Sequence, residues 1–242
     1  MEHILVPVDL TVTPTLVADQ VFEVLRSRIL TGELAGGYPL RVRDVAALVG
    51  TSVMPVREAI RRLEEAGLAT RVPHRGAVVR KFSVAELIHI YDVRTILEVQ
   101  AARRGAVMVT DKDLAVMQAA CDRMLQAVAE DRVSDALDDD EVVHRTLYQA
   151  AENPVLTSVI ENLWLQCRPY KVIGATEAIA SNDTTLWTTQ QAIVDAASNR
   201  DAEAASAIID QSLASALQRL ERRLISSDSS ESHQESVVAN SR

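Results

Sequence analysis

The feature that most constrains the fold is a change in hydrophobic periodicity between residues 16 and 79. Apolar residues recur at helical spacing in three successive stretches, 16–30, 42–49 and 52–66. Two short β-prone runs follow at 68–72 and 77–79, and residues 73–76 between them have the composition of a hairpin turn. Three helices followed by a hairpin is the element order of a winged helix-turn-helix.

The rest of the chain predicts an all-helical bundle. Ser83 and Glu86 form a capping-box pattern that begins a new helical region. About six helices are expected there, at 83–108, 111–130, 133–151, 154–178, 184–199 and 201–226. Aromatic residues make up 3% of a chain that is 48% hydrophobic, so its core must consist mainly of Ala, Val, Leu and Ile. The expected fold class is therefore mostly α, with one small β-hairpin wing.

The charge distribution matches this division into domains. We expect an N-terminal arm (1–14), a winged helix-turn-helix domain (15–81), an all-helical domain (82–226) and a disordered Ser- and Glu-rich tail (227–242). The net charge is −9, but residues 15–81 carry 11 Lys and Arg against 7 Asp and Glu. A positively charged front domain allows an acidic chain to meet nucleic acid through one end.

Membrane and metal signals are weak. No apolar run approaches the roughly 18 residues that a membrane helix needs, and the N-terminus lacks the pattern of a signal peptide. Cys121 and Cys167 have no metal-ligand spacing. We therefore expect a cytoplasmic protein with reduced, packed thiols and no membrane partner.

The helix-turn-helix stretch contains residue types suited to DNA. Gly50 permits the sharp turn, and Ser52 is expected to cap the third helix, whose N-terminus can also donate to phosphate. Arg57 lies on the polar side of this helix, and Arg61 and Arg62 lie further along it. Either these arginines contact guanine edges and phosphates, or they only solvate an exposed helix.

The stretch Pro-Val-Arg-Glu-Ala-Ile-Arg-Arg-Leu-Glu-Glu-Ala-Gly-Leu at 55–68 resembles the recognition-helix signature of GntR-type regulators. Blocks at 29–34, 40–47 and 74–79 extend the resemblance over about sixty residues. The DNA contacts that it implies are Arg43, Ser52, Arg57 and the wing tip at His74, Arg75 and Gly76.

One position departs from the family pattern. The family usually has Arg two residues before the Pro of this signature, whereas this chain has Val53 there, followed by Met54. Either the operator differs from the common family sequence, or the contact at Val53 is apolar, for example to a thymine methyl group. We include Val53 and Met54 among the predicted DNA contacts.

The second domain resembles the all-helical FCD domain of the FadR-like GntR subfamily. The matching blocks are 90–98, 144–156, 192–196 and 199–205. This resemblance implies a cavity for a small effector, a homodimer and a palindromic operator in double-stranded DNA.

The FCD domains that this second domain resembles often bind a divalent metal. The metal ligands in them are an Asp and a His four residues apart and one His on each of the last two helices. Asp140 and His144 match the first pair, but Gln190 and Ser212 stand at the other two positions. Two protein ligands rarely hold a transition metal tightly, so we expect no metal cofactor and regard Asp140 and His144 as vestigial ligands. The predicted effector-binding residues are Arg94, Asp140, His144, Gln190 and Ser212.

Other interpretations of these residues remain open. Arg94 either clamps a carboxylate in the cavity or forms a surface salt bridge to Glu98. His144 either contacts the effector or makes a structural hydrogen bond. The acidic run at 138–141 is either metal-binding or, apart from Asp140, an exposed helical stretch.

Together these features predict a sequence-specific DNA-binding transcription regulator, with repression as the expected sense. Its operator affinity would be modulated by an organic acid or a related metabolite. One alternative is a helical dimerisation and DNA-binding protein without an effector. Another is a metal-dependent hydrolase, which the missing ligands and the absence of a motif such as GxSxG disfavour.

Overall fold

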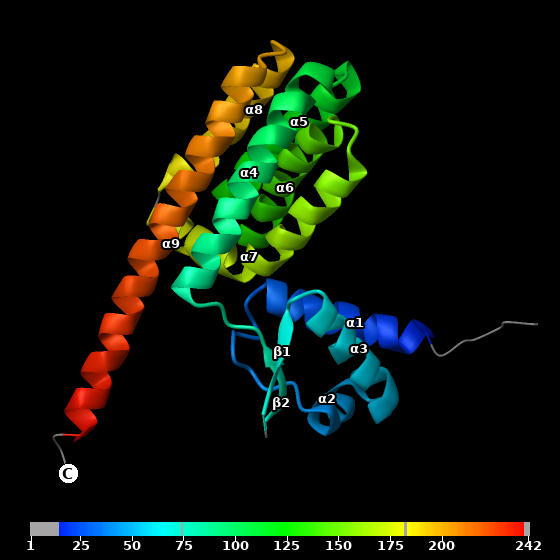
Figure 1. Ribbon diagram of the computed structural model, residues 1–242, viewed down its shortest axis with the longest axis vertical. Helices are drawn as coiled ribbons and strands as arrows, with labels where there is room; N and C mark the ends of the chain where they lie inside the picture. Colours follow the sequence, from blue (N-terminus) through cyan, green and yellow to red (C-terminus); the bar gives the residue numbers. More distant parts are fainter. Residues whose placement is uncertain (1–14, 74, 182, 240–242) are drawn as a thin grey trace, which may run out of the picture. The chain divides into compact units, whose positions relative to one another are not determined.

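The computed structural model describes residues 15–73, 75–181 and 183–239, and the chain divides into two compact units between Lys81 and Phe82. The short segment 30–32 is grouped with the second unit. The described residues are mostly helical and contain one two-stranded sheet, which confirms the expected fold class (Figure 1). The predicted arm, 1–14, lies outside the described residues.

The first unit has the order predicted for a winged helix-turn-helix. Its elements are α1 (Thr15–Leu30), α2 (Val42–Val49), α3 (Val53–Glu65), β1 (Ala69–Val72) and β2 (Gly76–Val79). Gly50 ends α2 with a φ of 69°, a left-handed conformation that glycine adopts without steric cost. The strands pair antiparallel, from Ala69 opposite Val79 to Val72 opposite Gly76.

The core of this unit comes from the predicted apolar stripes. Four residues of α3 are buried, namely Val56, Ala59, Ile60 and Leu63. On α1 the structure buries Val21, Leu25 and Ile29 but leaves Val17 and Val24 exposed. The α1 stripe is therefore narrower than the sequence pattern indicated, because only one face of the helix packs on the unit.

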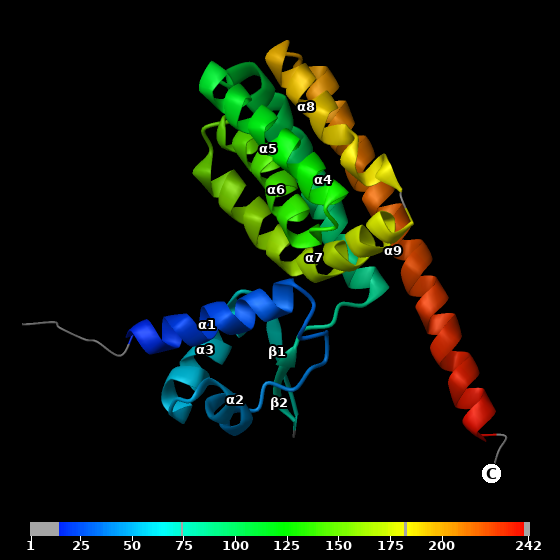
Figure 2. The same cartoon turned by 180° about the vertical axis from the view of Figure 1, so that it is seen from behind.

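The second unit is a helical bundle. Its elements are α4 (Val84–Met108), α5 (Asp111–Ala129), α6 (Val133–Gln149), α7 (Pro154–Ala180), the 3-10 turn η1 (Thr184–Trp187), α8 (Thr189–Ser198) and α9 (Ala202–Ala239). The most extensive packing joins α5 to α6 and α4 to α9 (Figures 1 and 2). The predicted capping box of Ser83 and Glu86 is confirmed at the start of α4.

Small residues let these helices approach closely. A Cβ atom on Gly105 of α4 would lie 1.9 Å from the carbonyl oxygen of Leu147 on α6, so only glycine fits there. Both cysteines are free and buried, and burial raises the pKa of Cys121 to about 11. A thiol with this pKa is protonated near neutral pH, so Cys121 is a packing residue rather than a reactive one.

One sequence expectation for this unit is wrong. The stretch predicted as one helix at 184–199 is divided at Thr188 into η1 and α8, and Asp183 caps the turn by accepting a hydrogen bond from the Thr185 N–H at 3.0 Å. Within the segment predicted as a disordered tail, α9 extends to Ala239, and residues 240–242 lie outside the described residues.

Candidate DNA-binding surface and effector cavity

The start of α3 exposes the groups that the sequence assigned to DNA. Ser52 occupies the N-cap position, but its side chain makes no capping hydrogen bond, so the prediction of a side-chain cap is wrong. The first backbone N–H groups of a helix have no partner within the helix. Without the serine cap, they remain available to an incoming phosphate oxygen.

The arginines of the first unit fall into two groups. One group is held in ion pairs: Arg61 contacts Glu58 and Glu65, Arg62 contacts Asp19 and stacks over Phe22, and Arg71 donates to Glu64. For these arginines, the structure agrees with the alternative that they only solvate or stabilise an exposed surface.

The second group comprises Arg43 on α2, Arg57 on α3 and Arg75 in the hairpin turn. All three are exposed, and their side chains make no hydrogen bond or ion pair within the described part of the chain. The predicted base- and phosphate-contacting arginines are thus the unpaired ones. Arg57 and Arg61 lie one helical turn apart on α3, but of the two only Arg61 is held in ion pairs.

The remaining predicted DNA contacts are apolar or lie at the wing. Val53 is 39% exposed and Met54 69% exposed, at the start of α3. Exposed apolar side chains at this place suit contact with thymine methyl groups. Gly76 begins β2 with a φ of 77°, and His74 lies outside the described residues.

A cavity of about 520 Å³ lies within the second unit. It is lined by residues of α4, α6, α7, η1, α8 and α9. All five residues predicted to bind the effector line it, namely Arg94, Asp140, His144, Gln190 and Ser212. The fold therefore brings together side chains that are up to 118 positions apart in the sequence.

Arg94 and Glu98 form an ion pair, but it is buried rather than on the surface. Arg94 Nε donates to Glu98 Oε1 at 2.7 Å, and Trp164 Nε1 donates to the same oxygen at 2.9 Å. Tyr148 donates its hydroxyl to Glu98 Oε2 at 3.1 Å. Burial disfavours the charged guanidinium, but the charge of Glu98, its hydrogen bond and smaller contributions from neighbouring groups together raise the pKa of Arg94 well above its ordinary value.

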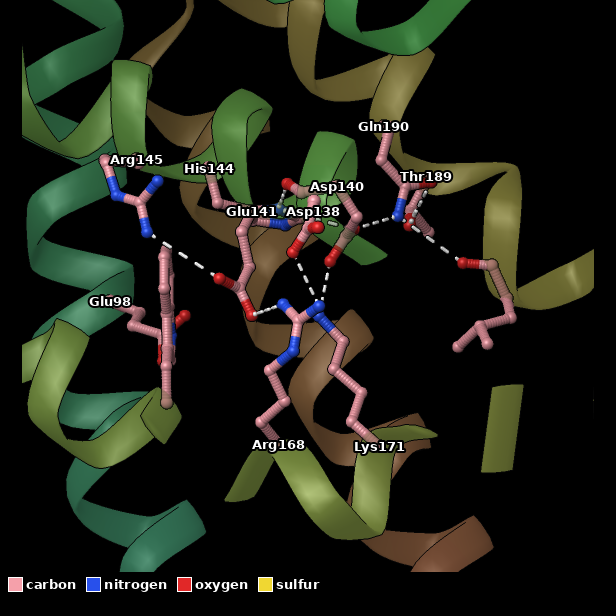
Figure 3. Close-up of polar contacts among 12 residues, drawn as sticks. Glu98, Asp138, Asp140, Glu141, His144, Arg145, Arg168, Lys171, Thr189 and Gln190 are labelled. Atoms are coloured by element: carbon pink, nitrogen blue, oxygen red, sulfur yellow. Dashed lines mark hydrogen bonds and ion pairs between the residues drawn. The ribbon is translucent and has the colours of Figure 1, made fainter. Parts of the chain in front are cut away.

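Side chains from two other helices hold Asp140 in the cavity. Gln190 Nε2 lies 2.5 Å from its Oδ1, and the Lys171 ammonium contacts its Oδ2 (Figure 3). Burial alone would raise the pKa of Asp140, but the charges of Lys171 and His144 and these hydrogen bonds lower it below its ordinary range. Asp140 is therefore an anion with a cation already beside it.

His144 makes the structural hydrogen bond that we considered. Its Nδ1 lies 2.8 Å from the backbone oxygen of Asp140, one helical turn earlier, and 3.5 Å from the Oδ1 of the same residue. Because a carbonyl oxygen only accepts, Nδ1 donates, and Nε2 is the ring atom left to accept. The rings of Tyr148 and Trp164 stand edge-on to His144.

The acidic run at 138–141 is neither a metal cluster nor an exposed stretch. Each carboxylate contacts a cation: Arg168 contacts both Asp138 and Glu141 at 2.6 Å, and Arg123 donates to Asp139 at 2.9 Å. Only Asp138 among these is mostly exposed. The prediction of an exposed acidic face is therefore wrong for Asp139 and Glu141.

Sequence reasoning missed Lys171 and Trp187. Lys171 and Arg168 are the only cations of α7 and stand one helical turn apart, a spacing that could have indicated partners for the acidic run. Trp187 lines the cavity and is 4% exposed. Its Nε1 is a buried donor without a partner in the described structure, and such a donor costs free energy unless a ligand or water accepts its hydrogen.

Comparison with known families agrees with the two-part architecture. Residues 17–79 match the family described as "Bacterial regulatory proteins, gntR family", and residues 89–215 match the "FCD domain". The chain therefore belongs to the GntR family of bacterial transcription regulators and carries an FCD domain in its second unit. No helix in the described ranges is long and apolar enough to cross a membrane.

Individual relatives are regulators as well. The chain is 31% identical over 147 residues to the HTH-type transcriptional repressor RspR of Escherichia coli K12, an alignment that covers 61% of this chain and 64% of RspR. It is 39% identical over 94 residues to a probable D-xylose utilization operon transcriptional repressor of Paenarthrobacter nicotinovorans, covering 39% of this chain and 42% of that protein. The chain thus matches less than two thirds of the length of either repressor.

The solved structure of E. coli McbR/YncC has the same fold. It superposes with a TM-score of 0.72 at 22% identity, covering 86% of this chain and 98% of that one. At this identity the likeness concerns the fold alone.

Proposed function

We propose that this protein is a sequence-specific DNA-binding repressor whose operator affinity changes when an organic acid or related metabolite enters the cavity of its FCD domain. The observation that carries the proposal is the set of exposed, unpaired arginines at the helix-turn-helix, Arg43, Arg57 and Arg75. Repressors among the relatives support the expected sense. As part of this proposal, the protein acts in the cytoplasm and has no catalytic role.

The unpaired arginines support DNA binding for an energetic reason. An arginine that already holds a carboxylate must lose that contact before it binds phosphate, whereas an exposed unpaired arginine loses only water and counterions. Arg57 stands in the second turn of α3, where recognition helices reach base edges. Arg75 in the hairpin turn would add a contact to the DNA phosphate backbone.

The cavity supports an effector by its size and its polar lining. Its volume of about 520 Å³ falls within the range of small-molecule sites. Glu98 accepts from Arg94 Nε, and we assign a carboxylate of the effector to the terminal nitrogens of the same guanidinium. We assign hydroxyl groups of the effector to Gln190 and Ser212. The unpartnered Nε1 of Trp187 offers a further donor for an acceptor atom of the ligand.

A homodimer on a palindromic operator is the assembly that we propose. Val93, Ile96 and Val107 share one face of α4 and are exposed, Ile96 by 67%. An exposed apolar stripe of this kind is suited to association with a second copy. Light scattering should give about twice the 26.5 kDa of one chain, and Ile96→Glu should shift the mass towards the monomer.

The proposal is tested by selecting genomic DNA fragments on the purified protein and footprinting the best one. We expect a protected palindrome whose affinity changes when a metabolite library is added. Equal affinity for selected and random DNA at physiological salt would contradict the proposal of sequence-specific binding. A selected operator with no metabolite that raises the melting temperature would instead favour a DNA-binding dimer without an effector.

A further inference from the structure

The polar end of the cavity is where the family resemblance places a divalent metal. The resembling domains use one carboxylate and three imidazoles for it. The corresponding residues of this chain are Asp140, His144, Gln190 and Ser212, and their surroundings can be tested for a fit to such an ion. They do not fit, for three independent reasons.

The first reason is that both carboxylate oxygens of Asp140 are already in use. Oδ1 accepts from Gln190 Nε2 at 2.5 Å, and Oδ2 accepts from the Lys171 ammonium. The Asp140 side chain is only 4% exposed, so its remaining surface is closed to a further ligand. A metal ion would have to displace one of these donors before it could reach the carboxylate.

The second reason is the lack of imidazole or thiolate groups. Within the described ranges no three His, Cys, Asp or Glu side chains gather closely enough to hold a metal ion. His144 donates from Nδ1 to the Asp140 backbone oxygen, so its Nε2 is the single imidazole nitrogen that these four residues offer to a ligand. Gln190 turns its donating amide nitrogen towards Asp140, and its amide oxygen accepts from the Thr189 hydroxyl at 3.4 Å.

The third reason is charge. Lys171 reaches Asp140 from α7, beside Arg168, which holds Asp138 and Glu141 from the same side (Figure 3). The Lys171 ammonium forms an ion pair with the Asp140 carboxylate. A divalent cation beside Asp140 would therefore meet an existing positive charge at short range.

We propose that the Lys171 ammonium is the resident cation of this cavity, in the place that a divalent metal takes in the resembling domains. Lys171 neutralises Asp140 in the protein without effector and, because its side chain is 29% exposed towards the cavity, offers its remaining N–H groups to the ligand. The inference rests on the proposed function only in treating the cavity as an effector site.

An ammonium group in place of a metal ion changes the class of ligand that the cavity selects. A metal ion binds ligands by chelation and favours molecules with two adjacent oxygen donors, such as α-hydroxy acids. An ammonium group binds through directed hydrogen bonds and does not require a chelating pair. We therefore expect effectors with one carboxylate or a polar hydroxyl group, and binding that metal chelators do not affect.

The first test is calorimetric titration of untagged protein with Zn²⁺, Ni²⁺ and Mn²⁺. We expect no stoichiometric binding at metal concentrations up to about 100 µM, and no change in melting temperature on addition of EDTA. One-to-one binding in the micromolar range that Asp140→Asn abolishes would overturn the inference. This test uses the wild-type chain, so it does not depend on the folding of any variant.

The second test isolates Lys171 with a matched pair of variants. Gln190→His/Ser212→His supplies the two missing imidazoles and retains the ammonium, whereas Lys171→Ala/Gln190→His/Ser212→His also removes it. We expect the triple variant to bind Zn²⁺ at least about tenfold more tightly than the double variant, with an EDTA-reversible rise in melting temperature. Equal Zn²⁺ affinity of the two variants would show that Lys171 does not occupy the metal position.

The failure of this inference can be told apart from failure of the proposed function. Metal titration measures the cavity alone, and DNA binding measures the helix-turn-helix alone. A wild-type chain that binds its operator but also holds Zn²⁺ tightly contradicts only the role of Lys171. A chain that binds neither metal nor specific DNA retains that role and loses the proposed regulator function.

Discussion

The two units use positively charged side chains in opposite ways. At the helix-turn-helix, Arg43, Arg57 and Arg75 are exposed and have no partner in the described structure. In the cavity, Arg94 and Lys171 are each held by a carboxylate. A charge in water needs no partner, whereas a charge removed from water must be paired or it costs several kcal/mol. Pairing therefore distinguishes the surface that awaits a polyanion from the site that encloses a small molecule.

The largest expected effect comes from removing the carboxylate partner of a buried cation in the cavity. Glu98→Ala leaves the buried Arg94 without its counter-ion and removes the acceptor of both Trp164 Nε1 and the Tyr148 hydroxyl. We expect the free energy of unfolding to fall by about 3–5 kcal/mol, measured by urea denaturation. Glu161→Ala, which removes a half-exposed pair with Arg145, is the control and should cost below about 1 kcal/mol. Similar losses in both variants would contradict the importance of burial.

The next largest effect is expected at the unpaired arginines of the helix-turn-helix. Arg57→Ala should weaken operator binding more than about tenfold, because a charge-assisted contact worth about 1–3 kcal/mol is lost. Arg61→Ala is the matched control, since Arg61 lies one turn further along α3 and is held by Glu58 and Glu65. Fluorescence anisotropy with the selected operator gives both affinities. If the two variants bind equally, the division of arginines by pairing has no bearing on DNA recognition.

A smaller effect is expected at the hairpin turn. Arg75→Ala should reduce the slope of log affinity against log salt by about 1, because one phosphate contact no longer releases a counterion. Arg71→Ala, at an arginine that donates to Glu64 at 3.0 Å, should leave the slope unchanged. Anisotropy at several salt concentrations measures this. An unchanged slope for Arg75→Ala would place the wing away from the DNA backbone.

The smallest effect on stability is expected at Trp187. Its Nε1 has no partner in the described structure, so Trp187→Phe removes an unsatisfied donor and retains most of the buried ring. We expect the melting temperature without effector to change little, because no hydrogen bond is lost. Effector-induced stabilisation should fall in the same thermal-shift experiment. A large loss of stability without effector would mean that Nε1 has a partner, such as a buried water, in solution.

The sequence located the helices well because their signals are local. Gly50, the capping box of Ser83 and Glu86 and the stripe from Val56 to Leu63 act within one or two turns of chain, and each is found as expected. The failures are also local in origin. Ser52 occupies the cap position without using its hydroxyl, and η1 separates from α8 at Thr188.

The residues of the candidate sites show the same difference between local and long-range information in the sequence. Arg57 and Arg75 could be predicted as DNA contacts from the sequence because a motif on one helix and one hairpin carries them. The residues that the FCD resemblance implies line one cavity. The partners within that cavity could not be assigned. Lys171 lies 31 positions from Asp140, and Gln190 lies 50 positions from it.

The sequence by itself thus determined the order of helices, the wing and the residue types available to bind DNA and ligand, because periodicity, capping and motif spacing are properties of neighbouring residues. Only the tertiary structure decided which charges are paired. It placed Lys171 against Asp140, held Arg94 on Glu98 and left Trp187 Nε1 without an acceptor in the described structure. The physical reason is that pairing and desolvation depend on distances of a few ångströms between helices that are remote in the chain.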